Sequence, residues 1–559
     1  MESKILIIVF TALLLSSIGG WNISATPTFW DDGSEQEVVS AIISEMNDQE
    51  LLGQVFMLGY VGQYPHLEFN NWIKNRHIGG VKIFSRNVKT LASLASDINN
   101  MQRSSMQGPF RIPLMVATDQ EGGWVNHLKA ETSKTAGNLA LGATGLLRDS
   151  YLTGYYIGQE LRQVGINMNF APTIDIYSNP NASVIGPRAF SSDPRQTAFL
   201  AIAYFRGMSR QGIICTAKHY PGHGDADKDS HGTLPEIDIS FAEMWERELL
   251  PYRLLIREGL PAIMSGHLAY PEILNNNDPS SLSPFFSHQV LREKMGFEGI
   301  LVTDDLEMNG ALVGGLSTAE AGQAALEAGN DMILISHTPR IQEQAWNRLL
   351  KLMRKAPAFR LRVEQAVERI LKIKWRSFRG ENPVPLYADP EQAARAIPSP
   401  EGADFFWQHS VRSITVVKDE NIPFLPAEDE KLLIVGQFPG FLEAGLARYP
   451  QADTFLFPYS PFYYSLDRYR SAIILKTGDY DTIIFCLANF NSLEILKALE
   501  NSGKRILVIS TLTPVYLRET LWVTSSIAVY GTSRESFKSG FGALIGDFIP
   551  EGKLPVKFF

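Results

Sequence analysis

The sequence predicts an α/β protein: a (β/α)₈ TIM-type barrel followed by a smaller α/β layered domain. Between residues 50 and 340, short apolar runs alternate with longer amphipathic stretches, as in repeated βα units around a parallel sheet. Eight such runs can be counted, which is the number of strands that closes a barrel. An open doubly wound sheet also fits the alternation, but the count and the length favour the barrel. A chain of 559 residues is also too long for a single core.

The elements of the predicted barrel follow in order along the chain. The apolar runs predict strands at residues 54–58, 80–84, 112–118, 166–170, 213–218, 262–266, 300–303 and 332–335. Apolar residues at helical spacing predict helices that include residues 90–103, 147–163, 195–210, 241–257 and 318–328.

We assign residues 35–376 to the barrel, residues 377–402 to a linker and residues 403–559 to the second domain. The linker is rich in proline and polar residues. Further strands are predicted after it, at residues 413–417, 432–435, 482–486, 506–510 and 527–530. No G-x-G-x-x-G follows the first of them, so the sequence does not support a dinucleotide-binding role.

Residues 1–25 are typical of a secretory signal peptide. Lys4 precedes an apolar run over residues 5–15, and small residues follow it. The run is short for a bilayer span, so an uncleaved anchor is the weaker interpretation. We therefore expect export to the periplasm or the extracellular space. The two cysteines, Cys215 and Cys486, each lie in an apolar strand-like run and are expected to be buried core thiols.

Composition narrows the class of partner. The chain is 45% hydrophobic and 20% charged, as in ordinary globular proteins, and its net charge is -9. A negative balance disfavours a nucleic-acid role and makes a neutral or small substrate the better expectation.

Polar residues stand where four predicted strands end. They are Asp119, then Lys218 with His219, then His267, then Asp304 with Asp305. A carboxylate at a strand end often only caps the next helix. Agreement among four strand ends instead favours an active site at the C-terminal face of the barrel.

The densest polar segment is residues 218–232, with three histidines and three aspartates among glycines and a proline. His219, His223 and His231 could bind zinc. However, a Pro-Gly pair between the first two prevents helical display and no H-E-x-x-H is present, so we expect no metal. The alternative is acid/base chemistry. Asp229 and His231 are two apart on an extended loop, where the carboxylate can orient an imidazole that exchanges protons near neutrality.

Residues 218–235 resemble the K-H-[FY]-P-G-H-G-D-x-x-x-D-S-H-x-x-L-P signature of the β-N-acetylhexosaminidases of glycoside hydrolase family 3. The resemblance covers residues 40–375, with a weaker echo of the family's second domain at residues 542–556. Further matching segments lie at residues 79–87, 119–123, 169–190 and 303–308.

This resemblance implies a retaining two-step mechanism. Asp304 would attack the anomeric carbon, His231 would serve as acid and then base, and Asp229 would orient and charge-balance His231. Retaining enzymes usually use two carboxylates about 5–5.5 Å apart. Because a neutral imidazole does not repel an anion as a carboxylate does, phosphate could replace water, and phosphorolysis is an alternative.

The resemblance also implies which side chains hold the sugar hydroxyls: Asp119, Arg188, Lys218 and His219. Charged donors and acceptors make directional bonds to a neutral polar ring. For Asp175 and Asp225, a supporting role is at least as well favoured.

The sequence departs from the family pattern D-Q-E-G-G-R-V-x-R at two positions. Trp124 and His127 stand where the family has arginines, the second of which helps to hold the sugar. His127 could replace that arginine as a weaker donor, or Trp124 could offer a stacking face to another sugar.

The implied function is a hydrolase that removes terminal non-reducing β-linked N-acetylhexosamine from peptidoglycan fragments or chitooligosaccharides. We expect a carbohydrate as partner and no cofactor, no metal, no nucleic acid and no membrane partner beyond a possible N-terminal anchor. Three alternatives are a phosphorylase with the same residues, a non-catalytic sugar-binding cell-wall protein and a metal-dependent hydrolase.

Overall fold

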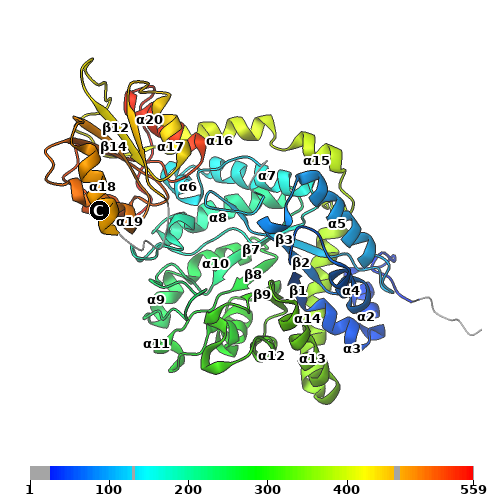
Figure 1. Cartoon of the computed structure of the whole chain (residues 1–559). Coiled ribbons are helices and arrows are strands. Elements are labelled where there is room, and N and C mark those ends of the chain that lie inside the picture. Colours follow the sequence, from blue (N-terminus) through cyan, green and yellow to red (C-terminus); the bar gives the residue numbers. More distant parts are fainter. Residues whose placement is uncertain (1–25, 129–131, 459–465, 558–559) are drawn as a thin grey trace, which may run out of the picture.

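The computed structural model describes residues 26–128, 132–458 and 466–557, and it contains a barrel and a second, six-stranded sheet (Figure 1). The predicted signal peptide, residues 1–25, lies outside the described residues. In the part of the chain that the structure describes, no helix is both long and apolar enough to cross a membrane.

Eight parallel strands close the barrel in the order β1-β10-β9-β8-β7-β6-β3-β2. Each predicted apolar run overlaps one of them, so the predicted barrel is confirmed. The strands are β1 (Phe56–Gly59), β2 (Gly80–Ile83), β3 (Met115–Thr118), β6 (Met168–Asn169), β7 (Ile214–Tyr220), β8 (Ala262–Ser265), β9 (Ile300–Asp305) and β10 (Met332–Ile335).

Helices surround the barrel. They are α2 (Glu35–Glu45), α3 (Asp48–Gln54), α4 (Leu67–Arg76), α5 (Leu91–Ser105), α6 (Asn138–Thr144), α7 (Leu147–Gln163), α8 (Pro194–Ser209), α9 (Phe241–Glu246), α10 (Leu249–Arg257), α11 (Pro271–Leu274), α12 (Thr318–Ala328), α13 (Pro339–Lys355) and α14 (Pro357–Phe378). The helix predicted at 241–257 is divided into α9 and α10. Pro251 has no N–H to donate to the carbonyl four residues earlier, so a continuous helix would lose that bond and clash at Arg247.

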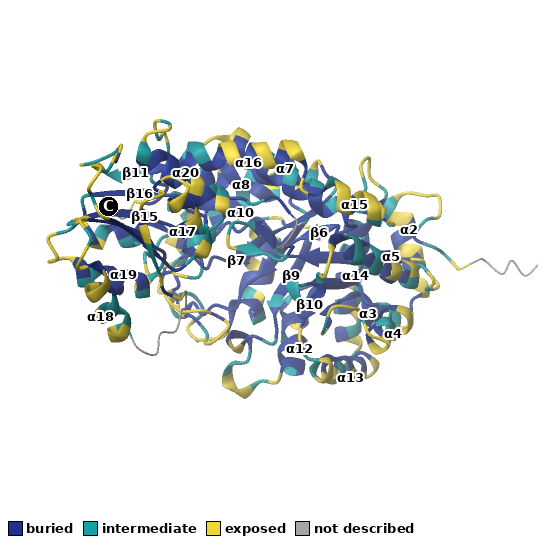
Figure 2. Ribbon diagram, turned by 45° about the horizontal axis from the view of Figure 1, so that its top comes forward, coloured by how far each residue is buried: buried dark blue, intermediate teal, exposed yellow. Residues whose placement is uncertain are grey.

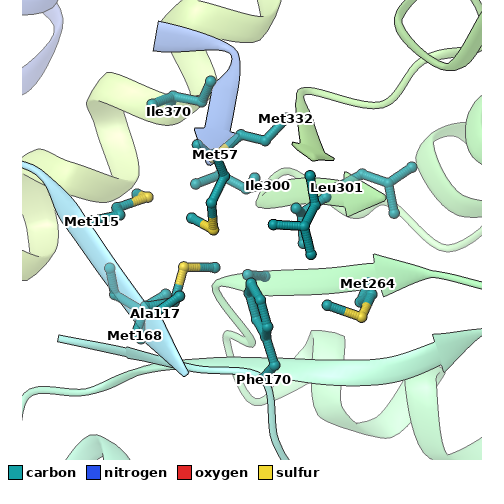
Figure 3. Close-up of a cluster of buried hydrophobic side chains, with 14 of the residues drawn as sticks. Met57, Met115, Ala117, Met168, Phe170, Met264, Ile300, Leu301, Met332 and Ile370 are labelled. Carbon is teal, nitrogen blue, oxygen red and sulfur yellow. The ribbon is translucent and has the colours of Figure 1, made fainter. Parts of the chain in front are cut away.

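The barrel interior is a packed core rich in methionine (Figure 3). Met57, Met115, Met168 and Met332 are buried there, and unbranched methionine side chains fit an irregular space. Phe170 lies at one side of this core, and its ring also borders a polar cavity described below.

The second domain is a sheet with the strand order β11-β16-β15-β14-β12-β13, in which only β11 is antiparallel to its neighbour. Its strands are β11 (Thr415–Lys418), β12 (Leu432–Gly436), β13 (Asp453–Leu456), β14 (Thr482–Leu487), β15 (Arg505–Ser510) and β16 (Ser525–Ala528). The five predicted strands are present. The sixth, β13, is a partly exposed edge strand without a long apolar run, so apolar patterning did not reveal it.

Helices cover both faces of this sheet, which makes it the expected layered α/β domain. On one face, α17 (Pro439–Leu446) and α20 (Arg534–Ile545) pack on alternate strand residues such as Ile434 and Ile484. On the other, α18 (Leu466–Thr477) and α19 (Phe490–Leu496) pack on their neighbours. The strands of both sheets are largely buried (Figure 2).

The two domains share a buried cluster beside α6. Leu139 of α6 and Tyr177 pack with Val515 and Tyr530 of the second domain, and the Tyr177 hydroxyl lies 3.0 Å from Oγ1 of Thr513. Thus the second domain packs on the α6–α7 side of the barrel (Figure 1).

The segment interpreted as a linker contains helix α15 (Pro390–Ala396), which packs on α5 and α7, and its end overlaps the start of α16 (Pro400–Ser413). Asp389 caps α15 by accepting from the N–H groups of Glu391 and Gln392. The two cysteines are free thiols in the cores of the two domains, as expected.

Candidate active site

A polar cavity of about 390 Å³ lies at the C-terminal ends of the barrel strands. This is where active sites of such barrels lie, and the volume is within the range of about 300–1,000 Å³ usual for small-molecule sites. Six of the seven predicted site residues line it: Asp119, Arg188, Lys218, His219, His231 and Asp304.

Asp119, which directly follows β3, contacts the side chains of two lysines. Nζ of Lys218 lies 2.5 Å from its Oδ1, and Lys82 of β2 contacts its Oδ2. Both lysine side chains are buried, and burial lowers the pKa of each. The carboxylate of Asp119 is itself partly exposed to the cavity. It can therefore accept a further hydrogen bond from a ligand hydroxyl.

Glu121 forms the second part of the polar wall. It belongs to the hairpin of β4 (Gln120–Gly122) and β5 (Val125–Asn126), whose turn uses Gly122 and Gly123 at positive φ, where other residues are strained. Arg188 binds the Glu121 carboxylate with two nitrogens, at 2.7 and 3.0 Å, and Lys218 lies 2.6 Å from it. Although burial opposes ionisation, these cations lower the pKa of Glu121.

His219 is held in one orientation by partners on both ring nitrogens. Nη2 of Arg188 lies 3.2 Å from Nε2, and Nδ1 lies 2.7 Å from Oδ2 of Asp175. Because a guanidinium only donates, Nε2 accepts and Nδ1 carries the proton. Asp175 also accepts from the backbone N–H groups of His219 and His223. Although burial opposes ionisation, His219 lowers the pKa of Asp175.

Asp304 is the penultimate residue of β9 and lies beside this wall. Its Oδ1 accepts from the backbone N–H of Asp305 at 2.8 Å. Although burial opposes ionisation, His219 and His267 lower the pKa of Asp304 to about 2. The group is therefore an anion at neutral pH, as a nucleophilic carboxylate must be.

The loop after β7 carries the paired Asp229 and His231. Nδ1 of His231 lies 2.7 Å from Oδ1 of Asp229, which also accepts from the His231 backbone N–H at 3.0 Å. This hydrogen bond raises the pKa of His231 and lowers that of Asp229 to about 2. The His231 side chain is 72% exposed and that of Asp229 46%. His231 lines the cavity, and Asp229 supports it from outside.

The same loop is fixed next to the segment that follows Asp304. The backbone N–H of Gly310 donates to the Ser230 carbonyl at 3.1 Å, and Asn309 donates to the Gly232 carbonyl at 3.4 Å. A Cβ on Gly310 would lie 3.0 Å from that Ser230 oxygen. The close approach keeps His231 and Asp304 at one cavity.

Some polar residues that the sequence singled out lie outside the cavity. His267 is fully buried, with Nδ1 2.7 Å from Ser281 Oγ and Nε2 3.2 Å from the Asp305 carbonyl. Asp225 pairs with Arg247 at 2.6 Å. Asp175 and Asp225 thus support the loop after β7. Within residues 26–128, 132–458 and 466–557, no cluster of three or more His, Cys, Asp or Glu side chains is arranged to hold a metal ion.

Four ionisable side chains of the cavity were not selected from the sequence: Lys82, Glu121, Glu307 and His337. Two signals could have found some of them. Lys82 is a lone charge in an otherwise apolar strand, and His337 follows the end of β10, as the strand-end rule requires. Nε2 of His337 lies 3.2 Å from Asp305, and its backbone N–H donates to Glu307.

The two positions that depart from the family pattern have different surroundings. His127 lines the cavity, with Nε2 3.5 Å from Asp119 and Nδ1 3.0 Å from Ser85 Oγ. It is therefore placed to donate near the carboxylate of Asp119. Trp124 lies at the tip of the β4–β5 hairpin and is 47% exposed outside the cavity.

Comparison with known proteins finds one family model that matches the barrel region and several related enzymes. The sequence model of the glycosyl hydrolase family 3 N terminal domain matches residues 49–373. A β-hexosaminidase of Methylococcus capsulatus is 37% identical over 289 residues, covering 51% of this chain and 83% of that protein. β-Hexosaminidase A of Pseudoalteromonas piscicida is 36% identical over 258 residues, covering 44% of this chain, and the match spans only 43% of that relative's length.

A solved structure is similar over both domains. The family 3 β-N-acetylglucosaminidase from Paenibacillus sp. str. FPU-7 superposes with a TM-score of 0.82 at 27% identity, covering 92% of this chain and 99% of that one. A β-glucoside phosphorylase superposes with a TM-score of 0.77 at 22% identity, covering 96% of this chain and 99% of that one, which shows a shared fold.

Proposed function

The chain belongs to glycosyl hydrolase family 3, and on this premise we propose that it is a retaining exo-β-N-acetylhexosaminidase. One observation carries the proposal. Asp304, from the end of β9, and His231, from the loop after β7, line the same cavity, and His231 is paired with Asp229. The β-hexosaminidases to which the chain is similar support the activity.

In the first step, an oxygen of Asp304 bonds to the anomeric carbon while the bond to the leaving oxygen breaks. His231 gives its proton to that oxygen. The low pKa of Asp304 keeps the nucleophile ionised, and the raised pKa of His231 keeps more of the acid form at neutral pH.

In the second step, neutral His231 takes a proton from water, whose oxygen bonds to the anomeric carbon as Asp304 leaves. The stereochemistry is retained because the carbon is displaced twice. Asp229 remains ionised throughout and stabilises the imidazolium of His231. It acts on the sugar only through that ring, which makes it a positioning residue.

Asp119, Arg188, Lys218 and His219 would hold the sugar hydroxyls. They form one connected polar wall, so each already points in a fixed direction before a ligand arrives. Because these donors and acceptors are already ordered, binding a polar ring does not carry the free-energy cost of ordering their side chains.

The activity is tested with an aryl N-acetyl-β-glucosaminide. We expect Asp304→Ala and Asp304→Asn to abolish release of the phenol and His231→Ala to impair it strongly. The assignment is wrong if these variants keep full activity. The anomer formed first, followed by NMR, distinguishes retention from inversion. Activity that survives a chelator excludes a metal-dependent hydrolase.

Phosphorolysis is the second candidate, because His231 does not repel an anion once it is neutral and the cavity contains the cations Lys82 and Arg188. A time course with and without phosphate separates the two reactions. Free N-acetylglucosamine in phosphate buffer indicates hydrolysis, whereas the sugar 1-phosphate indicates phosphorolysis.

We further propose export through the N-terminal segment and action on peptidoglycan-derived fragments or chitooligosaccharides. Mass analysis of the protein recovered from the cell envelope or the medium would reveal whether residues 1–25 are removed. Parallel assays with both kinds of oligosaccharide would identify the preferred substrate.

A further inference from the structure

The two carboxylate oxygens of Asp119 have different partners. Oδ1 is bound by Lys218, which also binds Glu121. Oδ2 is approached by two side chains from different elements: Lys82 of β2 pairs with it, and Nε2 of His127, which directly follows β5, lies 3.5 Å away. Both of these side chains line the catalytic cavity, so Oδ2 is the point where they meet.

Lys82 supplies a fixed charge at this point. Its side chain is 2% exposed, and Nζ lies 4.9 Å from the ring centre of Phe84 and 4.5 Å from that of Phe170. The face of an aromatic ring attracts a cation, so the two rings help to hold the ammonium group beside Asp119. A lysine that is buried this deeply can fix the carboxylate, but it offers almost no surface to a ligand.

His127 supplies a donor at the surface of the cavity. Its backbone N–H donates to the Asp119 carbonyl at 3.3 Å, and Nδ1 lies 3.0 Å from Oγ of Ser85, so the residue is held from two sides. When Ser85 donates to Nδ1, the proton of the neutral ring is on Nε2, and the imidazolium also carries a proton there. The donor therefore faces Asp119.

The gap between His127 and Asp119 has the size that a bridging hydroxyl needs. At 3.5 Å, Nε2 and Oδ2 are farther apart than in a usual N–H···O hydrogen bond, which is about 2.7–3.2 Å long. A hydroxyl oxygen about 2.8 Å from both atoms can accept from Nε2 and donate to Oδ2. The side chains of His127 and Asp119 are 23% and 16% exposed, so a sugar hydroxyl in the cavity can reach this position.

We propose that Lys82 and His127 divide the recognition of one sugar hydroxyl between them. Lys82 holds Asp119 ionised and in place, and His127 donates to the hydroxyl that Asp119 accepts from. His127 thus contacts the substrate, whereas Lys82 acts through Asp119 and is a positioning residue. The proposal rests on the exo-hexosaminidase function above and adds two residues to the recognition of its sugar.

The first test is a rescue experiment with an aryl N-acetyl-β-glucosaminide. An arginine carries a charge and directed donors in one group, so an arginine at position 127 should make Lys82 dispensable. We expect kcat/KM to fall roughly 10- to 100-fold in Lys82→Met and to return to within about threefold of the wild type in Lys82→Met/His127→Arg.

The matched control is Lys82→Met/His288→Arg, which should stay as impaired as Lys82→Met. His288 is an exposed histidine on the helix Phe285–Lys294, outside the catalytic cavity. If His127→Arg restores no more activity than this control does, the proposed division of roles is overturned.

The second test identifies the hydroxyl. His127→Ala and the wild type are compared on the aryl glycoside and on its 3-deoxy, 4-deoxy and 6-deoxy derivatives. We expect kcat/KM of His127→Ala to be about five- to tenfold lower than wild type on the parent glycoside, and this difference to disappear on the derivative that lacks the bridging hydroxyl. An equal loss on all four substrates would indicate a merely structural role of His127 and would overturn the proposal.

Failure of the proposed function is a separate result, which is seen when the wild type cleaves none of these substrates. The Kd of N-acetylglucosamine and of its deoxy derivatives, measured by NMR titration, then replaces kcat/KM in the same comparisons. The predicted rescue and the predicted loss of the His127 effect on one derivative are the same for binding.

Discussion

Replacement of Asp229 by asparagine tests the acid/base pair without removing the imidazole. The substitution keeps the size of the side chain and removes the charge that faces Nδ1 of His231 at 2.7 Å. Because the Asp229 hydrogen bond raises the pKa of His231, that pKa falls in the variant. The acid form is then lost at a lower pH.

The expected loss of kcat/KM in Asp229→Asn depends on how far the Asp229 and His231 side chains are exposed to solvent. A hydrogen bond to a charged group contributes about 1.5–3 kcal/mol. With side chains 46% and 72% exposed, solvent screening reduces this to about 1–2 kcal/mol. At 1.4 kcal/mol per factor of ten, kcat/KM should fall about 5- to 30-fold. Loss of the acid itself in His231→Ala should cost more, about 10²–10⁴-fold.

The assay is a pH profile of kcat/KM on aryl glycosides with leaving groups of different acidity. We expect the alkaline limb of the Asp229→Asn profile to move to lower pH, and the loss to shrink for a more acidic phenol, which needs less protonation. Asp227→Asn is the matched control, since Asp227 is an exposed aspartate of the same loop. An alkaline limb that does not move in Asp229→Asn, or one that moves equally in Asp227→Asn, would refute the assigned role.

Three further predictions concern the cavity and the stability of the fold. Lys82→Met removes a buried cation from Asp119, and kcat/KM on the aryl glycoside should fall roughly 10- to 100-fold; an unchanged value would contradict a role of Lys82 in the site. Leu139→Ala opens a cavity in the interdomain cluster, and chemical unfolding should show a loss of about 2–4 kcal/mol, whereas a loss below 1 kcal/mol would contradict tight packing there. Burial raises the pKa of Glu160 from 4.5 to about 7, so its contribution to stability is complete below pH 4.5 and is lost as pH rises through 7, by roughly 3 kcal/mol. Glu160→Gln, which can still accept from Ser133, should therefore be more stable than the wild type at pH 8 but not at pH 4.5, and equal gains at both would contradict this sign.

The barrel was predictable because its strands are buried on both sides. Runs such as residues 332–335 are apolar at every position, so each strand can be recognised from its own residues without knowing which strands lie beside it. The edge strand β13 lacks this signal because Asp453 and Leu456 are exposed. The division of the helix at Arg247 depends on Pro251. The spacing of apolar residues, from which the helix was predicted, does not reveal such a break.

The cavity was predictable at the strand ends, and less so inside the strands. Asp304 and His219 follow the rule for parallel barrels, whereas Lys82 lies within β2 and Glu121 in a short hairpin. The partner of a buried charge depends on tertiary contacts. The Glu121–Arg188 pair joins residues 67 positions apart, and no local pattern encodes such a pair.

The central claim is that Asp304 forms a covalent bond to the sugar. In His231→Ala the base that activates water is missing, so an activated aryl glycoside should load the enzyme faster than water unloads it. Denaturation during turnover, digestion and mass spectrometry should find one N-acetylhexosaminyl unit on the peptide that contains Asp304, and none in the double variant with Asp304→Asn. A sugar on a different residue, or an unmodified enzyme that still releases the phenol in a burst, would contradict the account.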